Sequence, residues 1–266
     1  MAAETLRREL RDHRRALIAW CVGIAAYVTL IAAIFPSIHG SVQFDRLLEH
    51  YPEALKALFG LQGGSITTGA GYLDVELFSL MLPLLVIVLA IGAGARTFAG
   101  EEDAGRLELP LAYPVARARV VVWKAVGVAI QVLAAAVAAL IAIAVLDPIV
   151  GLDLSTGNLL QAIVALTVVG ILFGWIALAV GAAVPSRALA VGVPAAIGAT
   201  GYLVGGLHSL AVWLDPFRFV SPFWLVGTGP LRNGVDPVGV VVVAAIAVCV
   251  LLAGAWRVER RDLQTP

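Results

Sequence analysis

The sequence predicts an all-α polytopic membrane protein with six transmembrane helices. Of its 266 residues, 61% are hydrophobic and 14% are charged, whereas a soluble domain carries about 25% charged residues. The hydrophobic residues fall into six blocks of about 20 residues or more, the length that an α-helix needs to cross a hydrocarbon core of about 30 Å. Strands of a membrane barrel would be about 10 residues long and would alternate in polarity, which these blocks do not.

The six predicted helices follow one another along the whole chain. Because no backbone polar group can stay unsatisfied in lipid, a bundle of six helices is the economical arrangement for these blocks. We expect residues 1–266 to form a single transmembrane domain, with no soluble tract long enough to bury a core of its own. The predicted helices span residues 16–35, 75–95, 120–146, 159–184, 188–214 and 238–256.

Residues 4–15 precede the first helix and are rich in arginine. Leu6 and Leu10 fall on one helical face among these arginines, which can contact anionic headgroups. This pattern predicts a short interfacial helix at the membrane surface. A basic anchor that only sets the topology remains the alternative.

Lysine and arginine are distributed unequally over the segments that connect the helices. Positive residues accumulate on the cytoplasmic side of a membrane protein. The side that holds both termini carries 14 of the 18 positive residues, so both termini are predicted to be cytoplasmic. The other side holds Arg46, Lys56, Arg218 and Arg232. The fourteen are Arg7, Arg8, Arg11, Arg14, Arg15, Arg96, Arg106, Arg117, Arg119, Lys124, Arg187, Arg257, Arg260 and Arg261.

The segment after the first helix predicts a short amphipathic helix around residues 44–60, followed by a glycine-rich stretch. That stretch lacks the Gly-Lys-Ser/Thr ending of a phosphate-binding loop. Next come Asp74 and Glu76, which point to nearly opposite sides of a helix because they are two residues apart. They therefore predict no paired-carboxylate site. We interpret Asp74 and Glu76 as residues at the headgroup boundary, and a cation-recognition site is the alternative.

Glycines and prolines recur inside the predicted helices. Gly92 and Gly94 in the second helix, and Gly201 and Gly205 in the fifth, are small residues that let helices approach closely in lipid. Pro83 and Pro194 are candidate kink positions. The four histidines have no metal-ligand spacing, and the two cysteines lie in separate helices, so neither a metal site nor a disulfide is predicted.

Charge is concentrated between the second and third helices, in the tract EEDAGRLELPLAYPVARARVVVWK, residues 101–124. Leu107 and Leu111 share one helical face, and charged side chains surround them. This pattern predicts a short amphipathic helix along the inner membrane surface, limited by Pro110 and Pro114. An ordinary solvated loop is the alternative.

The same tract resembles the cytoplasmic signature of ABC-2 type transporter permeases. That signature runs approximately Glu-Glu-x-x-Gly-Thr-Leu-Glu-Leu-Leu-Leu-Ala-x-Pro-Val-Ser-Arg after the second helix. Arg106, Pro110 and Ala116 depart from this signature. These departures count against a continuous helix rather than against the family. The matching residues are Glu101, Glu102, Gly105, Leu107, Glu108, Leu109, Leu111, Ala112, Pro114, Val115 and Arg117.

Two further stretches resemble the same family: the inner turn GAAVPSRALAV, residues 181–191, and the outer segment SPFWLVGTGPLRNG, residues 221–234. The resemblance implies that residues 101–114 form a coupling helix seated in a groove of a separate nucleotide-binding subunit. The implied partner contacts are Glu101, Glu102, Gly105, Arg106, Leu107 and Glu108, with Arg187 as a second, weaker contact.

The resemblance also implies a function. The sequence contains no Walker motif, so we expect this chain to be no enzyme and to bind no cofactor, with ATP and Mg²⁺ held by two copies of a partner ATPase. A second six-helix permease, identical or similar, would complete an alternating-access path in the plasma membrane of a prokaryote. We expect membrane lipids, and no nucleic acid, as further partners.

The expected cargo is hydrophobic or amphipathic, as in drug efflux, and no substrate-binding residue can be named. One alternative is export of lipid or glycolipid precursors of the cell envelope. Another is an integral-membrane enzyme that modifies lipids, although the scattered carboxylates supply no converging catalytic group. A third is a membrane component that does not transport, such as a sensor or immunity factor.

Overall fold

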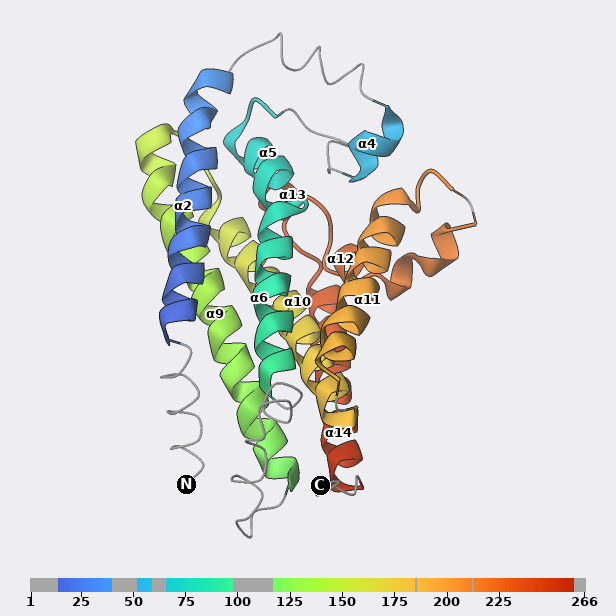
Figure 1. Cartoon of the computed structure of the whole chain (residues 1–266). Helices are drawn as coiled ribbons and strands as arrows, with labels where there is room; N and C mark the ends of the chain where they lie inside the picture. Colours follow the sequence, from blue (N-terminus) through green and yellow to red (C-terminus); the bar gives the residue numbers. More distant parts are fainter. Residues whose placement is uncertain are drawn as a thin grey trace.

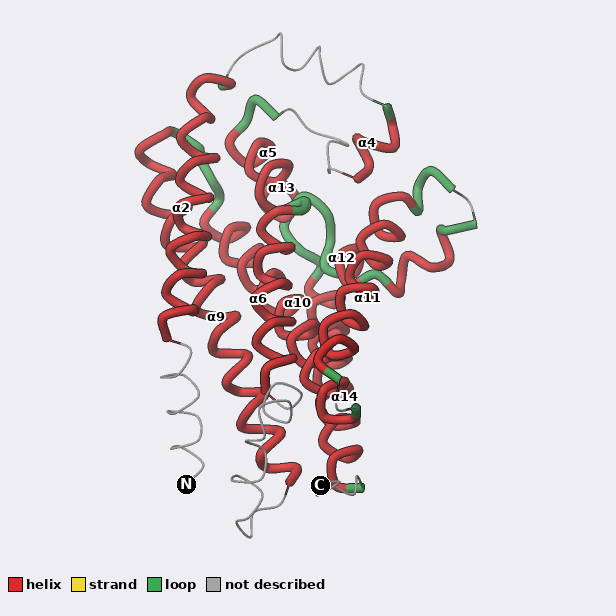
Figure 2. The backbone as a smooth tube through the Cα atoms, viewed as in Figure 1, coloured by secondary structure: helices red, strands yellow, loops and turns green. Residues whose placement is uncertain are grey.

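The structure, a computed structural model, describes residues 14–39, 52–58, 66–97, 117–184, 186–211 and 213–260. The backbone in these ranges is mostly helical, with short loops and turns, and contains no strand, as Figure 2 shows. Six helical spans in these ranges are long and apolar enough to cross a membrane. The all-α polytopic fold is therefore confirmed. The spans are Arg14–Ile38, Gly69–Thr97, Arg119–Val150, Thr156–Ala183, Arg187–Leu207 and Pro237–Glu259.

Helix α10 (Thr156–Ala183) lies at the centre of the bundle and contacts four other long helices. These neighbours are α6 (Met81–Thr97), α9 (Arg117–Val150), α11 (Arg187–Leu207) and α14 (Pro237–Glu259). Helix α2 (Arg14–Ile38) packs against α9 at one edge of the bundle (Figure 1). The first residue of α2 and the last residues of α14 lie toward the same end, the lower end in Figure 1. We call this the basic end, because Arg14, Arg96, Arg187 and Arg257 lie toward it.

The second span is interrupted near the end opposite the basic end. Helix α5 (Gly69–Leu73) passes into a π-helix, η1 (Asp74–Phe78), before α6 begins at Met81. In η1 the Ser79 amide donates to the Asp74 carbonyl at 2.8 Å, one residue further back than in an α-helix. Pro83 follows the interruption and has no N–H to donate to the preceding turn. The proline predicted to disturb this helix thus lies just after its break, whereas α11 continues through Pro194.

The fifth helix was predicted to span residues 188–214, and this prediction is wrong at its end, because α11 stops at Leu207. Its 21 residues already span the hydrocarbon core at about 1.5 Å per residue. The chain then folds back, and Asp215 accepts a hydrogen bond from Arg218 Nη1 at 2.9 Å and lies 3.1 Å from His208 Nδ1. The apolar residues after Leu207 extended the hydrophobic block without extending the helix.

Glycines explain how closely two of the central helices approach. A Cβ atom on Gly94 of α6 would lie 2.2 Å from the carbonyl oxygen of Gly174 on α10. Gly201 and Gly205 of α11 instead face the short helix α12 (Pro222–Leu225), since their added Cβ atoms would meet Pro222 and Ser221. Gly94 therefore serves helix packing as predicted. The pair in α11 admits a short segment of the same chain rather than another long helix.

Replacing Gly94 by Ala is expected to lower the free energy of unfolding by about 1–3 kcal/mol, the usual cost of overpacking. The new methyl group meets backbone atoms, which cannot rotate away. Gly92→Ala is the matched control in the same helix, because its Cβ meets only Arg96 Nη1, at 3.4 Å. Equilibrium unfolding in mixed micelles measures both variants, and equal destabilisation would contradict the close approach of α6 and α10.

Two predicted surface helices lie outside the described residues: the interfacial helix at residues 4–15, of which only Arg14 and Arg15 are described, and the coupling helix at residues 101–114. The amphipathic helix predicted around residues 44–60 is described only as α4 (Glu53–Leu58). Helix α4 packs on α11, where the Tyr202 hydroxyl donates to the Leu58 carbonyl at 2.6 Å.

Candidate functional site

At the basic end the structure joins the two helices that flank the charged tract. Lys124 of α9 is 2% exposed and its Nζ donates to the Thr97 carbonyl, at the end of α6, at 2.7 Å. Trp175 Nε1 of α10 donates to the carbonyl of the next residue of α9, Ala125, at 3.0 Å. The ends of α6 and α9 that lead into the tract are thus fastened to each other and to the central helix.

The predicted partner contacts are placed only in part. Glu101, Glu102, Gly105, Arg106, Leu107 and Glu108 lie outside the described residues, so their role stays a prediction. Arg187 is described: it is exposed, and it is the first residue of α11 after the short turn that follows α10. The hydroxyl of Ser186 caps this helix by accepting from the Leu189 amide at 3.3 Å. Arg187 is therefore presented at the basic end by a short, capped turn.

A buried ion pair lies near the other end of the bundle. The Asp74 side chain is 1% exposed and its Oδ2 lies 3.1 Å from Arg232 Nε. The same carboxylate accepts from the Leu231 amide at 2.9 Å and from the Arg232 amide at 3.1 Å. Three donors from one short stretch therefore fix Asp74, which offsets the cost of burying its charge.

The stretch that supplies these donors is the α12–α13 segment, residues 221–236, between α11 and α14. Its helix α13 (Pro230–Asn233) follows Gly229, which has φ of +65°, a conformation that suits glycine. A Cβ atom on Gly229 would also lie 3.2 Å from Asp74 Oδ2. Glycine at this position therefore lets the amides of α13 reach the carboxylate.

The α12–α13 segment is also fastened to the central helix. Asn158 Nδ2 of α10 donates to the Leu231 carbonyl at 2.9 Å, and Gln161 Oε1 accepts from the Val235 amide at 3.3 Å. At its start Ser221 is fully buried, and its hydroxyl accepts from the Trp224 amide at 3.2 Å. The segment is thus a structured part of the bundle that bridges η1 and α10.

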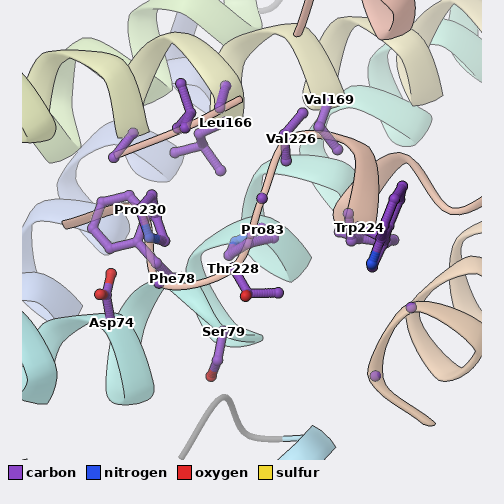
Figure 3. A pocket seen from close by; sticks show the side chains of 18 of the residues that line it. Asp74, Phe78, Ser79, Pro83, Leu166, Val169, Trp224, Val226, Thr228 and Pro230 are labelled. Atoms are coloured by element: carbon purple, nitrogen blue, oxygen red, sulfur yellow. The ribbon is translucent and has the colours of Figure 1, made fainter. Parts of the chain in front are cut away.

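A cavity of about 120 Å³ lies beside the ion pair. Residues of α6, α10, α11, η1 and the α12–α13 segment line it, and Ala57 and Leu58 of α4 contribute on one side. Figure 3 shows Phe78, Leu166, Val169 and Val226 around this space, with Asp74 at one margin. Most of the wall is apolar, and the charged atoms of Asp74 and Arg232 lie at its edge. A mostly apolar pocket with a few polar groups at its margin has the usual composition of a small-molecule site.

The sequence did not reveal the ion pair. The interpretation of Asp74 as a residue at the headgroup boundary stays a prediction. The cation-recognition alternative loses support because the buried Asp74 side chain pairs with Arg232. Glu76 is exposed, so the two carboxylates form no pair, as predicted. In the described residues no group of three or more His, Cys, Asp or Glu side chains could hold a metal ion. The one signal for this ion pair in the sequence was that Asp74 and Arg232 carry opposite charges on the same predicted side of the membrane.

Comparison with known protein families covers nearly the whole chain. The family described as ABC-2 family transporter protein matches residues 4–263. The chain belongs to this family. The resemblance seen in the charged tract is therefore confirmed, and the protein is a transmembrane subunit of an ABC transporter rather than its ATPase. A search of curated proteins found no significant match to the chain.

Permeases of the ABC-2 family generally work with an ATPase partner. The matched range includes the charged tract, the buried ion pair and the cavity. The helical spans and the family together make this permease an integral, multi-pass membrane protein.

Proposed function

We propose that this permease exports hydrophobic or amphipathic compounds across the plasma membrane of a prokaryote, driven by ATP hydrolysis in two copies of a separate ATPase subunit. The tract at residues 101–114 carries the proposal, because it combines the family signature with a position between α6 and α9. The basic end then faces the cytoplasm, as the excess of arginine there favours. We propose that both termini are on that side as well.

Coupling requires that movement of the tract reaches the transmembrane helices. The bond from Lys124 to the Thr97 carbonyl and the bond from Trp175 to the Ala125 carbonyl support this role. A rigid displacement of the tract would move the ends of α6 and α9 together, and α10 with them. The ATPase would thereby shift the bundle between two arrangements, as alternating access requires.

The exposure of α11 supports a pair of permeases. Only a narrow stripe of this helix is buried, at Ala190, Pro194, Gly198 and Gly201. Its remaining surface exposes many small residues, which favour close packing between helices in lipid. We propose that a second permease, identical or similar, packs on this face of α11 and encloses the transport path. The small exposed residues are Ala188, Gly192, Ala195, Ala196 and Ala199.

The test is a pull-down in mild detergent from native membranes that contain two differently tagged copies of the chain. We expect an ATP-binding subunit to co-purify, as identified by mass spectrometry. Recovery of the second tag indicates a homodimer, and recovery of a different six-helix permease indicates a heterodimer. A chain that purifies alone, under conditions that preserve other membrane complexes, would overturn the proposal.

A further inference from the structure

The cavity beside the ion pair is lined by residues of a single chain. Its walls are mostly aliphatic and aromatic, with Phe78, Leu166, Val169, Phe223 and Val226 among them. An apolar cavity of about 150 Å³ stays dry and binds a molecule such as benzene. At about 120 Å³, this cavity matches one ring or a short alkyl group in size.

Small residues and a fixed backbone create this space. Ala162 and Ala165 of α10 line the cavity where larger side chains would fill it. Ala165 is 5% exposed, so it faces the interior of the protein and not lipid. The π-helix η1 forms another part of the wall, and such interruptions are frequent at functional sites.

Hydrogen bonds connect several walls of the cavity to one another. Asp74 on η1 is bonded to the α12–α13 segment by three hydrogen bonds, and Asn158 bonds the same segment to α10. Three walls of the cavity are therefore joined by polar contacts at its edge and beside it. A preformed site of this kind loses little freedom on binding, which favours affinity.

The edge of the cavity is polar but has no net charge. Asp74 and Arg232 compensate each other, and the hydroxyl-bearing residues Ser79 and Thr228 also line the cavity. Thr228 lines the cavity and is exposed, so the cavity reaches the surface of the protein beside it. A molecule with an apolar end and an uncharged polar head matches this arrangement, because a charged head would meet both signs.

We propose that this cavity binds the apolar end of a neutral amphipathic molecule, with a ring or short alkyl group inside and a hydroxyl-type head at Thr228. The site is complete within one chain, so binding requires neither the ATPase nor a second permease. The proposal is therefore independent of the transport function proposed above.

The experiment uses the purified chain in phosphatidylcholine nanodiscs without ATPase or nucleotide. The first probe is a benzyl alcohol that carries a diazirine, and peptide mapping after photolysis locates the label. We expect label on residues 162–169 and 223–230, displaced by unlabelled benzyl alcohol. Ala165→Leu, which fills the cavity, should reduce this label about tenfold, equivalent to about 1.4 kcal/mol of binding free energy.

Val164→Leu is the matched control, because Val164 is the neighbouring residue on α10 but is 52% exposed. Its labelling should equal that of the unmodified chain. Val226→Phe fills the cavity from the α12–α13 segment, so the test stands even where Ala165→Leu does not fold. Label that is absent from both peptides, or equal in the filled variants and the control, overturns the proposal.

A second probe distinguishes the source of the ligand. Phosphatidylcholine with a diazirine at the end of one acyl chain labels the same two peptides where the bound group belongs to a membrane lipid. Label from benzyl alcohol alone indicates a small amphipathic compound. Label from both probes means that a lipid acyl chain also enters the cavity. Label from phosphatidylcholine alone, or from neither probe, overturns the proposal.

Discussion

Replacing Asp74 by Ala is expected to lower the free energy of unfolding by about 3–5 kcal/mol, the cost of breaking a buried ion pair from one side. The substitution removes the carboxylate from Arg232, whose side chain is 16% exposed. It also removes the acceptor of the Leu231 and Arg232 amides, and lost acceptors for buried donors are costly. Equilibrium unfolding in mixed micelles measures the loss.

Glu76→Ala is the control for this prediction. Glu76 lies two residues from Asp74 in η1 but is exposed, so its loss should change stability by no more than about 0.5 kcal/mol. The double variant Asp74→Leu with Arg232→Met should be less destabilised than Asp74→Ala alone, because no buried charge is left uncompensated. Asp74→Ala and Glu76→Ala with the same stability would mean that the ion pair contributes nothing.

The helices could be predicted from the sequence because their signal is local. A run of about 20 apolar residues fixes a spanning helix whatever its neighbours are. The end of α11 shows the limit of that signal. The segment after Leu207 is largely apolar, yet it leaves the helix and folds back to where Asp215 contacts His208 and Arg218. Length and hydropathy do not record where a chain turns at the membrane surface.

The candidate site could not be predicted because its parts are distant in sequence. Asp74 and Arg232 are 158 residues apart, and no periodicity connects them. The cavity depends on positions with small side chains, such as Ala165, and on the path of the α12–α13 segment. Gly205 shows the same difficulty, because a small-residue pattern predicts close packing but not its partner, here Ser221. Burial of a charge depends on the assembled bundle.

The charged tract is the opposite case, since its sequence indicates a function and its structure lies outside the described residues. Charge reversal at Glu101 and Glu102 to Lys is expected to abolish coupling while leaving membrane insertion intact. Removing one partner of an interfacial charge pair costs about 2–5 kcal/mol, and reversal adds repulsion. Transport and cargo-stimulated ATP hydrolysis, measured in proteoliposomes that contain the complete transporter, should fall by about 30-fold or more at that cost.

Asp103→Lys separates a specific contact from a general effect of charge. Asp103 lies in the same tract, but it occupies a variable position of the family signature. Its reversal changes the charge as much as Glu101→Lys does, so a purely electrostatic attraction between the tract and the ATPase would make the two single variants equal. A docking contact predicts a large loss for Glu101→Lys and a small one for Asp103→Lys. Unchanged complex formation and coupling in the Glu101 and Glu102 variant would remove these residues from the interface, and the ATPase would then have to be sought at Arg187 and the turn before α11.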